Sequence, residues 1–298
     1  MQINGWFRKV LLCAAVTAST LALLAGLTQP ASAVDFAGTN NSGGKLLYIQ
    51  PPTTDFTLSS VAGQPVGVAV APGQEILYTL SSVGEVHAFN PYTRTDVLLA
   101  KGFTNPTDII VDPGCASMLV SDIGVNKVFR ITFATRAVTT FYNGPDTIGG
   151  LVYDNFGNLY ANDLSLGAIV QFTTTGVITA QTPGPPLTAL EGLTYDQKTA
   201  SVYATSNTGQ VIYQAPGGLS SVTTILFANG PLLEGVAADG SGDLYVVGGN
   251  GTANNIYKYV VSTGVTTKVI AVPGLDRLAI IAPGPCIKSV GTDLVCSQ

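Results

Sequence analysis

The stretch GLVYDNFGNLYAND, residues 150–163, decides the fold. It contains two short runs of alternating apolar and polar residues, rich in β-branched and aromatic side chains, and a D-x-x-G turn separates them. Such runs predict two antiparallel strands. Two further runs, AIVQFT and VITAQ, follow and bring the number of strands to four within about forty residues, without helical periodicity. A unit of this kind is typical of one blade of a β-propeller.

The same unit recurs along the chain. Copies begin at Gly67, Asp108, Gly150, Gly192 and Gly235 and, in partial form, at Leu278, with spacings of 41, 42, 42, 43 and 43 residues. The last copy lacks its third and fourth strands, whereas the N-terminal segment Gly44–Ser59 aligns with the outer strands of the first copy. The sequence therefore predicts an all-β, six-bladed β-propeller with four-stranded antiparallel blades, its ring closed by N-terminal strands that complete the last blade. A β-sandwich pair is the alternative, but it explains neither the six copies nor the complementary ends.

Residues 1–33 have the features of a secretory signal peptide. Arg8 and Lys9 precede an apolar stretch, and Ala31-Ser32-Ala33 forms a cleavage motif, so we expect a mature propeller of residues 34–298 that is secreted or periplasmic. A retained membrane anchor is the alternative. No later segment is long and apolar enough to span a membrane. The mature part carries 11 positive and 18 negative side chains, a balance that argues against nucleic-acid binding. We expect a monomer whose partner is an unknown protein or small-molecule ligand.

The cysteines and the histidine restrict the possible chemistry. Cys286 and Cys296 flank a short segment around Gly291, and in an oxidising compartment we expect them to form a disulfide. We interpret Cys115 as a buried, unreactive thiol. The sole histidine, His87, lies in an outer strand, where we expect a packing or surface role. Its position argues against a Ser-His-Asp triad and against a histidine-based metal site.

Charged side chains gather at one predicted mouth of the central channel. In an antiparallel blade, the start of the first strand and the end of the second strand emerge on the same face. In the last three blades the residues before the repeat glycine position are Glu191, Glu234 and Arg277, and Glu234 could pair with Arg277 across adjacent blades. The second strands bring four more polar residues to the same mouth: Asp122, Asp163, Asn162 and Asn207.

The phrases GLVYDNFGNLYAND and GVAADGSGDLYVV resemble the repeats of NHL and gluconolactonase/regucalcin-like six-bladed propellers. The resemblance implies a calcium ion at the channel mouth and a calcium-dependent lactonase or a related hydrolase. Matched residue by residue, it implies four metal ligands: Glu191, Glu234, Asp163 and Asn162. It also implies Asp163 or Asp122 as the base toward a metal-bound water. Thr107 and Gly149 stand where the family has asparagine, which leaves the ligand set incomplete. Streptogramin lyase propellers resemble this repeat as well, but they rely on a histidine.

We therefore expect a non-enzymatic binding or interaction module that uses this mouth, with the hydrolase as the alternative. A structural interpretation stands beside both, because carboxylates at strand ends commonly accept hydrogen bonds from backbone N–H groups. We interpret the aspartates that recur after the first strand as turn residues: Asp112, Asp154, Asp196 and Asp239. We interpret the recurring tyrosines of the second strand as contacts between blades: Tyr78, Tyr160, Tyr203 and Tyr245.

Overall fold

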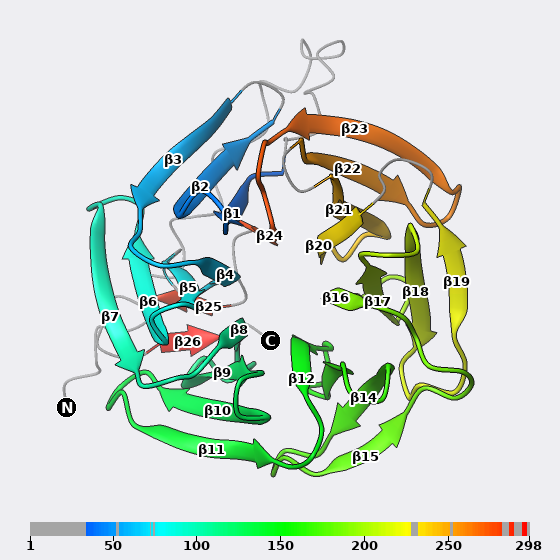
Figure 1. The fold of residues 1–298 in the computed structure, drawn as a ribbon, viewed down its shortest axis with the longest axis horizontal. Helices are drawn as coiled ribbons and strands as arrows, with labels where there is room; N and C mark the ends of the chain where they lie inside the picture. The colour runs from blue at the N-terminus through cyan, green and yellow to red at the C-terminus, as the bar shows by residue number, and fades with distance from the viewer. Residues whose placement is uncertain are drawn as a thin grey trace, which may run out of the picture. The chain divides into compact units, whose positions relative to one another are not determined.

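The computed structural model describes residues 34–51, 54–71, 73, 75–227, 232–250, 253–281, 286–288 and 294–296. The predicted signal peptide, residues 1–33, lies outside these ranges. Six four-stranded antiparallel sheets form a ring around a central axis, as Figure 1 shows, and this confirms the six-bladed β-propeller. No helix among the described residues is long and apolar enough to cross a membrane.

The strands take four places in their blades, from the axis outward. The innermost strands are β4 (Pro65–Val70), β8 (Pro106–Val111), β12 (Ile148–Tyr153), β16 (Leu190–Asp196), β20 (Leu232–Ala238) and β24 (Arg277–Ile280). The second strands are β5 (Ile76–Leu80), β9 (Ser117–Asp122), β13 (Leu159–Asp163), β17 (Ser201–Ser206), β21 (Asp243–Gly249) and β1 (Phe36–Asn40). The third strands are β6 (Glu85–Asn90), β10 (Lys127–Thr132), β14 (Ala168–Phe172), β18 (Val211–Pro216), β22 (Asn255–Val260) and β2 (Lys45–Gln50). The outermost strands are β7 (Thr95–Lys101), β11 (Val138–Asn143), β15 (Ile178–Gln181), β19 (Thr223–Leu226), β23 (Val265–Ala271) and β3 (Thr54–Ser60).

Both ends of the chain build the sixth blade. Strand β1 pairs with β24 on one side, Phe36 opposite Ile280, and with β2 on the other. The predicted closure is confirmed, but its division differs: three strands come from the N-terminus and one from the C-terminal part. The segment FAGTN was not predicted as a strand because all five residues of β1 are buried, so it shows no alternation of apolar and polar residues. Residues 286–288 (β25) and 294–296 (β26) form a separate two-stranded sheet.

The repeat glycines let the inner strands of neighbouring blades approach closely at the axis. A Cβ atom on Gly67 would lie 2.7 Å from the Cα of Asp108 in the next blade. A Cβ on Gly235 would lie 2.9 Å from the Cα of Arg277. Only a residue without a side chain fits so near another backbone, so the repeat glycine follows from the crowding at the axis.

The tyrosines of the second strands pack between blades, as expected, with one exception. Tyr160 of the third blade lies in the core of the fourth, and Tyr203 of the fourth lies in the core of the fifth. Tyr78 stands one position later in its strand, opposite Val68, and its side chain therefore faces the other side of its sheet. There it packs against residues of the sixth blade, including Ala37.

One cysteine departs from the expectation. Cys115 is disulfide-bonded rather than a free thiol, and it sits fully buried in the turn between β8 and β9. Its partner and the predicted Cys286–Cys296 disulfide lie outside the part of the chain whose side chains are described. Connectivity of this kind cannot be deduced from the spacing of cysteines alone.

Candidate functional site

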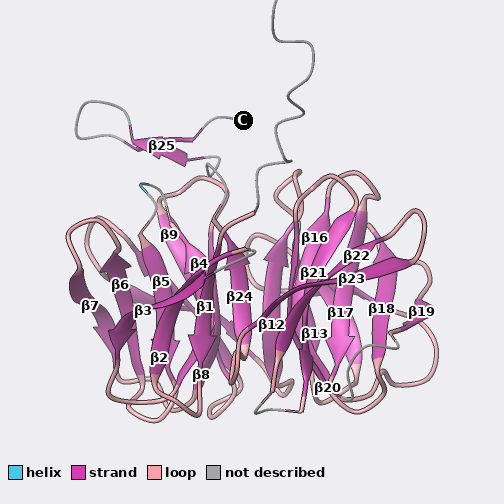
Figure 2. Ribbon diagram, turned by 90° about the horizontal axis from the view of Figure 1, so that it is seen from above, coloured by secondary structure: helices cyan, strands magenta, loops and turns pink. Residues whose placement is uncertain are grey.

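The channel mouth is the end of the ring at which the innermost strands begin and the second strands end. Figure 2 shows the ring from the side, with its strands running between the two faces. In the fourth blade Leu190, at the start of β16, pairs with Ser206, at the end of β17. Glu191 and Glu234 follow at the second and third positions of β16 and β20, and Arg277 opens β24.

Glu191 and Arg277 form an ion pair at this mouth. The Nη2 atom of Arg277 lies 2.6 Å from Oε2 of Glu191, and the side chains are 12% and 29% exposed. The amide of Asn207 donates to the other oxygen, Oε1, at 2.7 Å. Both oxygens of the Glu191 carboxylate are therefore engaged within the protein. Our expectation that Arg277 could pair with Glu234 of the adjacent blade is corrected, because the arginine reaches past that blade to the fourth.

Glu234 instead shares a hydrogen bond with Asp276, a residue that the repeat pattern does not mark. Burial raises the pKa of Glu234 to about 8, and the hydrogen bond and charge of Asp276 add to the shift. The neighbouring carboxyl group of Asp276 therefore favours the protonated form of Glu234. The position of Asp276, directly before Arg277, was the only sequence signal for it.

Asp108 is a second acid, partly buried, that the sequence did not assign to the channel. It occupies the repeat glycine position of the second blade, on an inner strand, and accepts a hydrogen bond from Leu151 N at 2.7 Å. Burial raises the pKa of Asp108 to about 6, while the bond from Leu151 and the charge of Arg277 act in the opposite direction. A charged residue in place of a repeat glycine was the available signal.

Arg277 is the cation that balances these acids. Burial alone would lower the pKa of Arg277, but Asp276, Glu191 and Asp108 outweigh burial and raise it. Its Nη1 atom is buried and has no hydrogen-bond partner among the described residues. In the described part of the chain, this guanidinium thus interacts with acids of the second, fourth and fifth blades and with Asp276, directly before β24.

The predicted catalytic aspartates hold backbone turns. Asp122 is buried and accepts hydrogen bonds from Thr104 N at 2.7 Å and Asn105 N at 2.8 Å, one at each carboxylate oxygen. Asp163 is also buried and accepts from the N–H groups of Ser165 and Leu166 through Oδ1. Its Oδ2 has no partner among the described atoms, and burial raises the pKa of this carboxyl group.

Asn162 links the third and fourth blades. Its side-chain amide donates to the backbone carbonyl of Glu191 at 3.0 Å, while its Oδ1 is buried without a partner in the described part of the chain. Thr205 makes the corresponding link from the fourth blade to the carbonyl of Glu234. The polar residue near the end of the second strand therefore joins neighbouring blades.

This donor set fits a calcium ion poorly. Calcium takes six to eight oxygen ligands, yet the described residues contain no group of three or more His, Cys, Asp or Glu side chains placed to hold a metal. The Glu191 carboxylate already contacts a guanidinium, whose positive charge disfavours a second cation nearby. The predicted calcium site thus has the sequence pattern as its only support.

His87 is a packing residue of the first blade. Its two ring nitrogens lie 3.1 Å from Glu85 and 3.1 Å from Asp96, and its ring stacks on Tyr78. It stands on β6, a third strand, away from the inner strands that line the channel.

Apolar side chains project from the mouth side of the first three blades. They occupy the turns between the second and third strands, and we call them the apolar rim: Val83 (50% exposed), Val125 (41%), Leu164 (38%) and Leu166 (46%). The corresponding turns of the fourth and sixth blades are polar, with the sequences NTGQ (207–210) and NSGG (41–44). The mouth is therefore apolar over one half of the ring and charged or polar over the other.

Comparison with known proteins supports the fold alone. No protein-family profile matches the chain. No curated protein matches it. A chain of a crystallised nidogen/laminin complex is 13% identical with a TM-score of 0.71, over 84% of this chain and 99% of that one. A streptogramin B lyase is 17% identical with a TM-score of 0.58, over 71% and 72%. A catalytically inactive histidine-to-alanine variant of virginiamycin B lyase from Staphylococcus aureus, crystallised with quinupristin, is 14% identical with a TM-score of 0.61, over 82% and 86%.

Proposed function

We propose that this propeller is an exported, non-enzymatic interaction module that binds another protein through its channel mouth. The observation that carries the proposal is the apolar rim, which lies beside the charged half of the same mouth. Exposed apolar side chains that gather on one face and border polar groups are typical of protein-binding surfaces. Scattered exposed apolar residues need no such explanation, but these occupy the same turn in three consecutive blades.

The comparisons agree with this proposal at the level of fold. One similar solved chain comes from a complex of two proteins, nidogen and laminin. Export rests on the predicted signal peptide, and the monomeric state on the closure of the ring by the chain's own two ends, so that no blade needs a strand from a second copy. Membership in the gluconolactonase/regucalcin-like group is part of the proposal and rests on the repeat phrases alone.

An enzymatic role has less support from the geometry. A calcium-dependent lactonase needs carboxylates open to metal and water, whereas Glu191 is paired with Arg277 and Asn207. Asp122 is occupied by backbone donors. In virginiamycin B lyase, the variant in which one histidine is replaced by alanine is catalytically inactive. The sole histidine here, His87, lies on β6, the third strand of its blade, away from the channel.

The first experiment tests the apolar rim directly. The triple variant Val83→Asp, Val125→Asp, Leu166→Asp places charges on the rim without removing a buried side chain, so we expect it to fold. A purified extracellular protein that binds the immobilised wild-type protein should no longer bind the immobilised triple variant. The matched control is Phe156→Ser, since Phe156 is 81% exposed in a turn on the opposite face. Equal retention by the triple variant would contradict the proposal.

A second experiment separates binding from calcium-dependent hydrolysis. Thermal melts with calcium and with a chelator should coincide for the wild type. A saturable rise in Tm that Glu191→Gln abolishes, together with turnover of a lactone that Asp163→Asn abolishes, would instead establish the hydrolase.

A further inference from the structure

Asp112 departs from the other turn aspartates. Asp154 and Asp239 accept hydrogen bonds from backbone N–H groups of their own turns, and Asp196 does so from Thr199 N, as expected for turn residues. The carboxylate of Asp112 instead receives the hydroxyl groups of Ser117 and Tyr153. It also lies 3.2 Å from Nε of Arg130. This aspartate therefore orients side chains rather than the turn.

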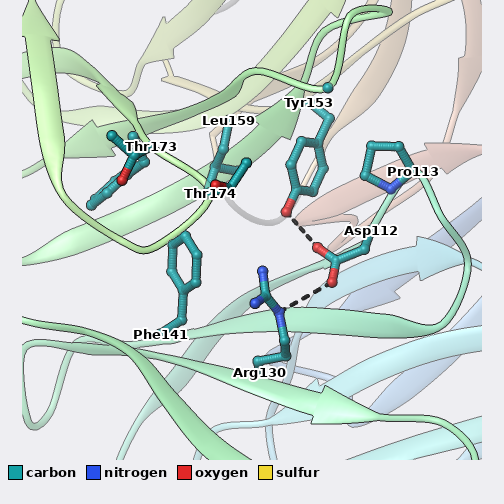
Figure 3. A pocket seen from close by; sticks show the side chains of 10 residues that line it. Asp112, Pro113, Arg130, Phe141, Tyr153, Leu159, Thr173 and Thr174 are labelled. Carbon is teal, nitrogen blue, oxygen red and sulfur yellow. Dashed lines mark hydrogen bonds and ion pairs between the residues drawn. The ribbon is translucent and has the colours of Figure 1, made fainter.

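Arg130 is held in a fixed plane by two contacts. Its Nε edge faces Asp112, and its guanidinium carbon lies 4.9 Å from the ring centre of Phe141, in a cation–π arrangement. Figure 3 shows the guanidinium between these two side chains. Tyr153 also makes a side-chain hydrogen bond with Arg130, and the arginine side chain is 34% exposed.

The arginine is particular to the second blade. The same register of the third strand, opposite the second strand's Leu119, carries alanine in the first blade and glutamine in the third and fourth. The fifth blade has Lys258, whose ammonium group is already 2.6 Å from Asp243. A contact that merely holds two blades together would not require this arginine, because the other blades pack against one another without one.

Arg130 lines a pocket of about 180 Å³ between the second and third blades. Phe141, Phe172, Leu159 and Tyr153 form apolar walls, and Thr174 lies at the rim. The turns that bound it follow the ends of the first and third strands, so it opens on the face opposite the channel mouth. The pocket is thus separate from the proposed interaction surface.

We propose that this pocket binds a small planar carboxylate with an apolar body about the size of one aromatic ring. The planar fork of arginine matches a carboxylate, and the aromatic walls fit a ring. An apolar cavity of about 150 Å³ accommodates benzene, so this volume is sufficient for one ring. Asp112 neutralises part of the charge of Arg130, and we therefore expect weak affinity, with Kd of roughly 1 mM.

Benzoate is the probe, and benzamide is its uncharged match of nearly the same shape. In a calorimetric or NMR titration of the folded protein, benzoate should bind saturably, and benzamide about tenfold more weakly. Arg130→Gln should weaken benzoate binding by about tenfold as well. The control, Arg136→Gln, removes an exposed arginine whose guanidinium donates, as far as the described residues show, to the Leu98 carbonyl, and it should leave binding unchanged.

Two results would overturn the proposal: equal binding of benzoate and benzamide, or undiminished benzoate binding by Arg130→Gln. Should Arg130→Gln not fold, Thr174→Trp serves in its place, because Thr174 is exposed at the rim and the indole would cover the opening. Unchanged benzoate binding by that variant would equally refute the site.

Discussion

Glu234 shows how burial and a neighbouring carboxylate set the charge of a single residue. The pKa of its carboxyl group rises from the ordinary value of 4.5 to about 8, first through burial and then through the hydrogen bond to Asp276. Below pH 4.5 the folded and unfolded forms are both protonated. As the pH rises toward 8, the unfolded chain ionises first, so the free energy of unfolding falls.

We therefore expect the Tm to fall between about pH 7 and pH 9, a range in which Asp108, with its pKa of about 6, has largely titrated. Glu234→Gln should flatten this dependence, because an amide cannot ionise. Each kcal/mol corresponds to about 2–4 °C in Tm for a domain of this size, so differential scanning calorimetry resolves the change. Glu75→Gln, at an exposed position, should keep the wild-type slope. A slope unchanged by Glu234→Gln would show that other groups cause it.

At the scale of elements, the contact between inner strands depends on the absence of a side chain. A Cβ on Gly235 of β20 would meet the backbone of β24 at Arg277 and Asp276, and backbone atoms cannot move aside as a flexible side chain would. The same crowding recurs between β16 and β20 at Gly192. With Gly67, these glycines allow close contact at the axis between the first and second blades, the fourth and fifth blades, and the fifth and sixth blades.

Gly235→Ala should destabilise the protein by about 1–3 kcal/mol, the usual cost of overpacking. Urea unfolding of the purified variant measures this loss. Gly114→Ala is the matched control, since a Cβ there meets nothing within 4 Å and its φ is not positive. If both variants had the same stability, the proposed role of the repeat glycine would be wrong.

At the scale of the whole molecule, closure of the ring depends on β1. This strand joins β24 to β2, and Phe36 within it packs edge-on against Tyr245 of the fifth blade at 5.0 Å. Without β1, the inner strand of the sixth blade would lose its only partner within its sheet.

A protein that begins at residue 44 should therefore not form a closed ring. Loss of Phe36 alone costs about 3–5 kcal/mol, a large part of the roughly 5–15 kcal/mol that is typical of a folded domain. Limited proteolysis and size-exclusion chromatography should show rapid cleavage and association through open sheet edges. The comparison is a protein that begins at residue 34, which should resist both. Equal resistance of the two proteins would refute this account of closure.

The candidate site was only partly predictable. The position before the repeat glycine correctly brought Glu191 and Arg277 to one mouth, since antiparallel pairing places equivalent residues on the same face. Asp276 and Asp108 were missed because neither stands at a position that the repeat marks as functional. Local pattern assigns a residue to a face, but it does not say which residues on that face touch.

The sequence by itself determined the period, the number of blades, the antiparallel order and the closure of the ring by its two ends. These features depend on strand alternation and turn residues, which act over a few neighbours in the chain. The tertiary structure alone decided that Arg277 pairs with Glu191, 86 residues away, that Glu234 forms a hydrogen bond with Asp276, and that Asp112 turns toward Arg130. Such pairings depend on the distance across the ring and on how deeply each charge is buried, and both exist only once the six blades have closed.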